Sequence, residues 1–198
     1  MNDLEVAAKE IVFWLQSRQI PYALIGGLAV SFHTIERFTK DIDFAVAVES
    51  DEHAEEVVRG IRLIGYQVHS LLEHTKHGRI ATVRLTKGTE GSILVDFLFA
   101  SSGIEIEVAA ESQPIEIFPN LLIRTATLPA LLALKVLAAD AQSRPQDVID
   151  IKHLLIEAAE DDLIQAEQLI RVIELRGYHR GKNLVEDFAG FKARFLNR

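Results

Sequence analysis

The feature that most constrains this chain is a pair of aspartates, Asp41 and Asp43, inside the otherwise apolar stretch of residues 41–48. Successive side chains of a β-strand point to opposite faces, so residues two apart share one face. Two carboxylates side by side in a buried strand are unfavourable unless a cation lies between them. The pair therefore predicts a strand with an acidic face and a divalent metal ion beside it.

A glycine pair, Gly26 and Gly27, follows the short apolar run of residues 22–25. This pattern predicts a strand over residues 22–25 and a helix over residues 27–35 that starts at the glycines. Glycine allows positive φ and close approach of a ligand to the backbone. The free N–H groups at the start of a helix bind phosphate. We expect this loop to receive phosphate near the two aspartates.

A third acid, Asp96, lies in the apolar run ILVDFLF. Alone, it is equally compatible with an edge strand facing water and with an acid held inward by a metal or a base. Beside Asp41 and Asp43, the inward position is favoured. Arg84 lies on the preceding predicted strand, where it could reach a triphosphate or form a cross-strand pair.

Composition narrows the class of protein. The 198 residues are 48% hydrophobic and 25% charged, which is typical of a globular protein with a real core. There is no cysteine, which excludes disulfides and thiolate zinc sites. Neither a signal peptide nor a membrane-length apolar run is visible, so we expect a soluble, cytoplasmic protein. The net charge is −8, but basic residues outnumber acidic ones from residue 171 onward.

The pattern along the chain indicates an α+β fold with two parts. Residues 1–126 are expected to form a mixed sheet with flanking helices, and residues 127–198 a helical C-terminal domain. After residue 103 we expect only a turn or two of helix and a strand near 115–118. The remaining predicted strands span 66–74, 79–86 and 92–100, and the remaining predicted helices span 3–19, 52–64, 128–139, 146–159, 163–176 and 182–196.

These motifs together resemble a known family. A glycine pair, then Asp-x-Asp, then a third aspartate on a later strand is similar to the polymerase-beta type of nucleotidyltransferase fold. The segments RFTKDIDF, VDFLF and LLALKVLAADAQSRPQDVIDIKHLL resemble its AbiEii/AbiGii toxin branch. The resemblance covers about residues 20–157 and implies a nucleotidyltransferase-type mixed sheet followed by a helical bundle.

The resemblance implies a role for each acid. Asp41 and Asp43 are expected to hold two Mg²⁺ ions, or Mn²⁺ in their place, that bridge a triphosphate. Asp96 is expected to complete the second ion and to help deprotonate the attacking hydroxyl. Bound metal ions of this kind neutralise the charge that develops on the phosphorus oxygens.

Further nucleotide contacts follow from the same resemblance. Arg37 precedes the acids and is expected to steady them or to bind phosphate. Lys135 is the only charge in the apolar stretch 128–139, and lysine is rarely buried without a partner. It is expected either to contact the nucleotide's phosphates or to form a structural ion pair with Asp147 or Asp150. Both aspartates lie three residues apart near one helix face, and which of them pairs with Lys135 stays open.

The implied function is Mg²⁺-dependent transfer of a nucleoside monophosphate from a nucleoside triphosphate to a hydroxyl, with release of pyrophosphate. The expected partners are RNA, such as the 3′ end of a transfer RNA, and an antitoxin protein, with no membrane. Two alternatives remain open: a non-catalytic nucleotide- or partner-binding module on the same fold, and transfer to a protein or small-molecule hydroxyl.

Overall fold

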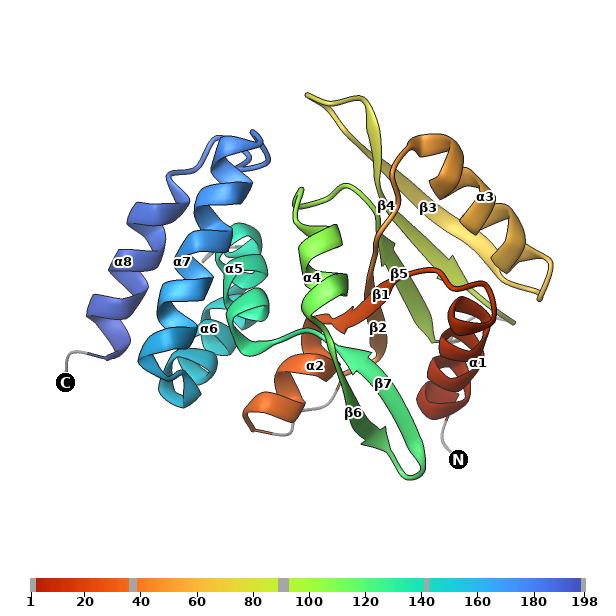
Figure 1. Ribbon diagram of the computed structural model, residues 1–198, viewed down its shortest axis with the longest axis horizontal. Coiled ribbons are helices and arrows are strands. Elements are labelled where there is room, and N and C mark those ends of the chain that lie inside the picture. The colour runs from red at the N-terminus through yellow and green to blue at the C-terminus, as the bar shows by residue number, and fades with distance from the viewer. Residues whose placement is uncertain (1–2, 36–38, 89–92, 141–142, 197–198) are drawn as a thin grey trace.

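The computed structural model describes residues 3–35, 39–88, 93–140 and 143–196. Within these ranges the chain forms one seven-stranded sheet, helices packed against it, and a group of helices at the C-terminal side (Figure 1). The strands are β1 (Tyr22–Ile25), β2 (Asp41–Val46), β3 (Gln67–His74), β4 (Arg79–Thr86), β5 (Leu94–Leu98), β6 (Gln113–Phe118) and β7 (Leu121–Thr125). The helices are α1 (Asp3–Ser17), α2 (Gly26–His33), α3 (Asp51–Arg62), α4 (Glu105–Glu111), α5 (Leu128–Ala138), α6 (Pro145–Glu157), α7 (Glu160–Leu175) and α8 (Leu184–Phe195).

The sheet is mixed, as predicted. Its strand order is β3-β4-β5-β2-β1-β7-β6. The pairs β2–β5 and β1–β7 are parallel, and the other neighbours are antiparallel. The predicted α+β class, with flanking helices and a helical C-terminal part, is therefore confirmed.

Alternation along β2 separates a core face from a polar face. Ile42, Phe44 and Val46 are fully buried, whereas Asp41 and Asp43, which alternate with the first two of them, keep some exposure. Phe44 meets Phe97 of β5 edge-on, with 6.2 Å between the ring centroids. This apolar face anchors the sheet in the core, so the intervening acids must point to the opposite face.

Most predicted helices and strands are present with shifts of a few residues at their ends. The start of α3 illustrates why the sequence specified them: the Ser50 hydroxyl accepts the His53 backbone N–H at 3.3 Å and caps the helix. The segment after residue 103 holds more structure than predicted. It forms α4 and then the hairpin of β6 and β7, of which β7 was not predicted.

The C-terminal helices pack on one another, and α5 and α6 also contact α2 (Figure 1). Helix α5 contacts α6, α7 and α8 and also α2, which explains its almost wholly apolar sequence. The division into domains at residues 126 and 127 stays a prediction. No helix in the described ranges is long and apolar enough to cross a bilayer.

Candidate active site

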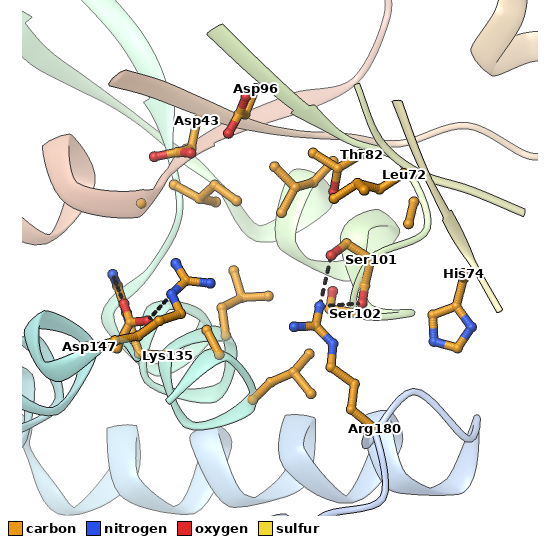
Figure 2. A pocket seen from close by; sticks show the side chains of 18 of the residues that line it. Asp43, Leu72, His74, Thr82, Asp96, Ser101, Ser102, Lys135, Asp147 and Arg180 are labelled. Carbon is orange, nitrogen blue, oxygen red and sulfur yellow. Dashed lines mark hydrogen bonds and ion pairs between the residues drawn. The ribbon is translucent and has the colours of Figure 1, made fainter. Parts of the chain in front are cut away.

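A cleft with a volume of about 1120 Å³ lies between the polar face of the sheet and the C-terminal helices (Figure 2). Asp41, Asp43 and Asp96 line its sheet side, next to Gly26 and Gly27. Residues of α5, of the start of α6 and of the loop after α7 line the facing side. The cleft therefore brings together residues that are separated by more than a hundred positions in the sequence.

Strand register places the three acids side by side. Asp43 of β2 and Asp96 of β5 are direct neighbours in the parallel pair, and Asp41 lies two positions from Asp43 on the same face. Figure 2 shows the Asp43 and Asp96 side chains next to each other at the cleft. Central strands, paired on both sides, hold these backbones in place.

Gly26 gives the carboxylate of Asp43 its space. Ile25 pairs with Asp43 across β1 and β2, and the chain turns into α2 at the next residue. A Cβ atom on Gly26 would lie 1.9 Å from Oδ2 of Asp43, and Gly26 has a φ of +68°. Only glycine combines that conformation with that contact. The carboxylate therefore lies directly against the N-terminus of a helix that no side chain caps.

The acids repel one another across the strands. The pKa of Asp43 is raised from 3.8 to about 6, first by burial and then by the negative charges of Asp96 and Asp41. Lys135 and Arg84 partly offset this rise in pKa. The arrangement thus has a surplus of negative charge at Asp43, which a cation would relieve.

Arg84 neutralises the third acid. It lies opposite Asp96 in the antiparallel pair β4–β5. Its Nε donates to Asp96 Oδ1 at 2.8 Å and its Nη2 to Oδ2 at 2.6 Å. Of the two positions that the sequence left open for Arg84, the structure has the cross-strand pair. Sequence reasoning could not choose between them, because the register of β4 against β5 is set by the whole sheet.

Lys135 pairs with both candidate aspartates of α6. Its Nζ lies 2.7 Å from Oδ1 of Asp147 and 2.7 Å from Oδ2 of Asp150. All three side chains are almost fully buried. Arg144 adds a contact of 2.8 Å to Asp147, and Gln146 donates to Asp150 at 2.9 Å. The structural ion pair is therefore present, and it places the lysine on the cleft wall that faces the sheet (Figure 2).

The far end of the cleft is basic. Lys76 in the β3–β4 turn and His179 and Arg180 in the loop after α7 line it. Arg180 donates from Nη2 to the backbone oxygen and to the hydroxyl of Ser101, both at 3.0 Å (Figure 2). Burial and the nearby positive charge of Arg144 lower the pKa of Arg180. The sequence had indicated the basic C-terminal segment, but not that Lys76 of the β3–β4 turn lines the cleft together with it.

Buried interactions fix this basic end in place. Tyr178 is largely buried and stacks on His77, with ring centroids 4.3 Å apart and an angle of 11° between the planes. His74 packs on the same ring at 4.6 Å. Gly103, at φ +75°, leaves room for the Tyr178 ring, since a Cβ there would lie 2.5 Å from it. The tyrosine therefore holds the loop against the sheet, and His77 covers one face of its ring.

The donor chemistry of the acids suits a hard divalent cation, because Mg²⁺ and Mn²⁺ prefer carboxylate oxygens. The space beside Asp43, and the like charges around it, fit such an ion. In the part of the chain that the structure describes, however, no three acid, histidine or cysteine side chains converge into a ready-made metal site. Asp96 faces Arg84 instead. Arg37 lies outside the described residues.

Comparison with known proteins agrees with this geometry. The solved structure of an antigenic nucleotidyltransferase-like protein from Paracoccidioides brasiliensis matches with a TM-score of 0.56 and 13% identity, over 99% of this chain and 97% of that one. The structure of ANT(2″)-Ia in complex with adenylyl-2″-tobramycin matches with a TM-score of 0.55 and 15% identity, over 88% of this chain and 99% of that one. At these identities the likeness establishes the fold.

A search of curated proteins finds no match. The sequence model described as "Nucleotidyl transferase AbiEii toxin, Type IV TA system" matches residues 13–196, which is nearly the whole chain. That match includes the glycine pair, the three acids and the Lys135 network. The chain therefore belongs to the AbiEii family of nucleotidyltransferase toxins and is a nucleotidyltransferase.

Proposed function

We propose that this protein transfers a nucleoside monophosphate from a nucleoside triphosphate to an acceptor hydroxyl in a Mg²⁺-dependent reaction. The observation that carries the proposal is the cluster of Asp41, Asp43 and Asp96 on one face of adjacent strands, beside the glycine turn at the start of α2. In the reaction the acceptor oxygen bonds to the α-phosphorus, the bond from that phosphorus to the bridging oxygen breaks, and pyrophosphate leaves.

Each residue of the cluster has a proposed role in this reaction. Asp41 and Asp43 would hold the metal ions, which supply charge neutralisation on the phosphates. The backbone at Gly26 and Gly27 receives phosphate at the helix N-terminus. Asp96 would complete the second ion and help to take the proton of the acceptor hydroxyl. Arg37, by its place in the sequence before the acids, is proposed to contribute a further phosphate contact.

Lys135 is proposed to bind a phosphate from the opposite wall of the cleft. An ammonium group has three N–H donors, and the contacts to Asp147 and Asp150 use two of them. The third can point toward the triphosphate. In this proposal Asp147 and Asp150 act through Lys135, because their carboxylates fix the position of its ammonium group.

The test is pyrophosphate release by the purified protein with each of the four nucleoside triphosphates, Mg²⁺ and a cellular RNA pool. We expect Asp43→Asn to lower the rate by at least about a thousandfold, as expected for loss of a metal ligand. Asp51→Asn is the matched control, because Asp51 pairs with Arg79 away from the cleft. Nucleotide binding without any pyrophosphate release would instead favour the non-catalytic binding module.

We further propose that the acceptor is RNA. Lys76, Arg144, His179 and Arg180 line the part of the cleft beyond the acids. Phosphate oxygens of a nucleic acid would be attracted there, whereas a polycationic aminoglycoside would be repelled. This favours RNA, such as a transfer RNA 3′ end, over the small-molecule acceptor. Membership of a type IV toxin–antitoxin family supports an antitoxin as a further partner.

The acceptor class is tested by incubating α-labelled nucleotide with RNA, protein and aminoglycoside fractions separately. Label is expected in RNA, and Lys76→Glu is expected to lower that labelling by roughly tenfold, with a weaker dependence on salt. Lys9→Glu, a change of the same charge at an exposed position of α1, is the control. Label that appears only in protein or aminoglycoside would refute the RNA acceptor.

A further inference from the structure

The Arg84–Asp96 pair is unlike the other arginine pairs that the structure describes. Both nitrogens of the guanidinium edge meet both oxygens of the carboxylate, at 2.8 and 2.6 Å. Such two-point contacts are strong and fix the orientation of both groups. The Asp96 side chain is only 9% exposed, so water cannot replace the arginine easily.

The pair sits inside the acidic cluster. Asp96 is the direct neighbour of Asp43 on the parallel strand, and Arg84 is the direct neighbour of Asp96 on the antiparallel one. Arg84 therefore brings a permanent positive charge into the group of carboxylates without being a metal ligand. Three strands in a row thus carry Asp43, Asp96 and Arg84 at one level of the sheet.

We propose that Arg84 takes the place of a metal ion at Asp96 until the metal-bound nucleotide arrives, and so sets the site's affinity for divalent cations. This inference rests on the proposed function for the identity of the site. Arg84 is a positioning residue that acts through Asp96. It keeps the third carboxylate ordered and neutralised, so that the nucleotide-free site holds divalent cations weakly through Asp41 and Asp43.

A carboxylate oxygen has two lone pairs, so Asp96 can share one oxygen between Arg84 and a cation. Sharing lowers the attraction for the cation, because the arginine charge repels it. Loss of Arg84 should then have two opposite effects. The site should bind free metal more tightly, and it should catalyse more slowly because Asp96 is no longer oriented.

The first experiment measures Mn²⁺ binding to the nucleotide-free protein from the electron paramagnetic resonance signal of free Mn²⁺. Arg84→Gln is expected to bind Mn²⁺ roughly tenfold more tightly than the original protein, because the Asp96 carboxylate is then available to the cation as a full, unshared ligand. Arg79→Gln is the matched control. Arg79 lies on the same strand and pairs with Asp51 at 3.2 Å outside the cleft, so it should change the affinity by less than about twofold.

The second experiment asks whether the effect passes through Asp96. In an Asp96→Asn background, Arg84→Gln should lose most of its effect on Mn²⁺ affinity. An equal gain in that background would mean that Arg84 acts only as a distant charge, and it would overturn the proposal. Unchanged or weaker Mn²⁺ binding by Arg84→Gln alone would overturn it as well.

A third measurement does not depend on whether Arg84 variants fold. Because Arg84 already occupies Asp96, Asp96→Asn should weaken nucleotide-free Mn²⁺ binding clearly less than Asp43→Asn does, which should weaken it by more than about tenfold. Equal losses would refute the inference. Pyrophosphate release is measured separately, so a protein that binds Mn²⁺ as described but transfers no nucleotide would contradict the proposed function and leave the role of Arg84 intact.

Discussion

The Asp43 carboxylate lies so close to Gly26 that a Cβ atom built on this glycine would be 1.9 Å from Oδ2 of Asp43. The glycine turn and the acidic strand are therefore one unit: the Asp43 side chain has room in the cleft only because the turn beside it lacks a side chain. The same contact brings the carboxylate to the N-terminus of α2, where a phosphate is proposed to bind.

This contact makes Gly26 sensitive to the smallest substitution. Gly26→Ala should lower the free energy of unfolding by at least about 2 kcal/mol, because it adds strain at φ +68° to a direct clash. Nucleotide binding should be lost in any protein that still folds. Gly190→Ala at an exposed position of α8 is the control, since a Cβ there meets nothing within 4 Å and alanine favours the helix. Urea unfolding of the two variants tests this prediction, and equal stabilities would contradict it.

The raised pKa of Asp43 predicts an unusual dependence of stability on pH. The folded protein holds this proton more tightly than the unfolded chain, since the pKa rises from 3.8 to about 6. Raising the pH from 3.8 to above about 6 should therefore lower the free energy of unfolding. Asp43→Asn should stabilise the metal-free protein by about 1 to 3 kcal/mol at pH 7.5 and by much less at pH 4.

Thermal unfolding at the two pH values in a chelator measures this difference. Asp187→Asn, an exposed change on α8, gives the background effect of removing one negative charge. With Mg²⁺ present, the original protein should gain stability and Asp43→Asn should not. A stabilisation that does not depend on pH would show that the charge of Asp43 is not its cause.

Removing Lys135 from its buried ion pairs should lower the stability of the folded protein strongly. Lys135→Met leaves the carboxylates of Asp147 and Asp150 buried without their shared cation, so the free energy of unfolding should fall by about 3 to 5 kcal/mol. Adding Asp147→Asn and Asp150→Asn should restore most of this loss. Lys192→Met is the control, because its partly exposed pair with Glu167 should contribute less than about 1 kcal/mol. Urea titrations measure all of these, and a mild effect of Lys135→Met would refute the interpretation.

Glu105 stabilises the backbone of residues 101–103 at the basic end of the cleft. Its buried carboxylate accepts the backbone N–H groups of Ser101, Ser102 and Gly103 at 2.8, 2.6 and 2.9 Å. Glu105→Gln places an N–H donor against these donors, so it should cost about 2 kcal/mol. Because Arg180 binds Ser101, RNA labelling should fall as well. Glu111→Gln, exposed on the same helix, should leave both stability and labelling unchanged.

Much of the fold was predictable because local signals agreed with the tertiary structure. The strand at residues 79–86 was predicted at its observed limits, and β2 and β5 were predicted with their acids. Alternation and apolar runs determine such elements. Strand β7 was missed because its five residues are specified by pairing with β1 and β6, which lie far away in sequence or across a short turn.

The candidate site was predicted in its residue types and only partly in its contacts. Sequence spacing could place Lys135 near Asp147 and Asp150, but it could not show that one ammonium meets both. The partner of Asp96 depends on the register of β4, and the basic end depends on how the loop after α7 docks beside the β3–β4 turn. These contacts arise from the packing of the whole chain, which no local pattern encodes.

The two ends of the cleft differ in how they are built, and this has a consequence for their motions and their evolution. The acids belong to central strands, whose amide hydrogens should exchange with solvent only on global unfolding. Lys76 and Arg180 belong to a turn and a loop, which tolerate insertions and sequence change far better. A lineage could therefore exchange one acceptor for another by altering the exposed positions of residues 75–78 and 176–183, while Tyr178 keeps the loop docked and the chemistry on the sheet stays untouched.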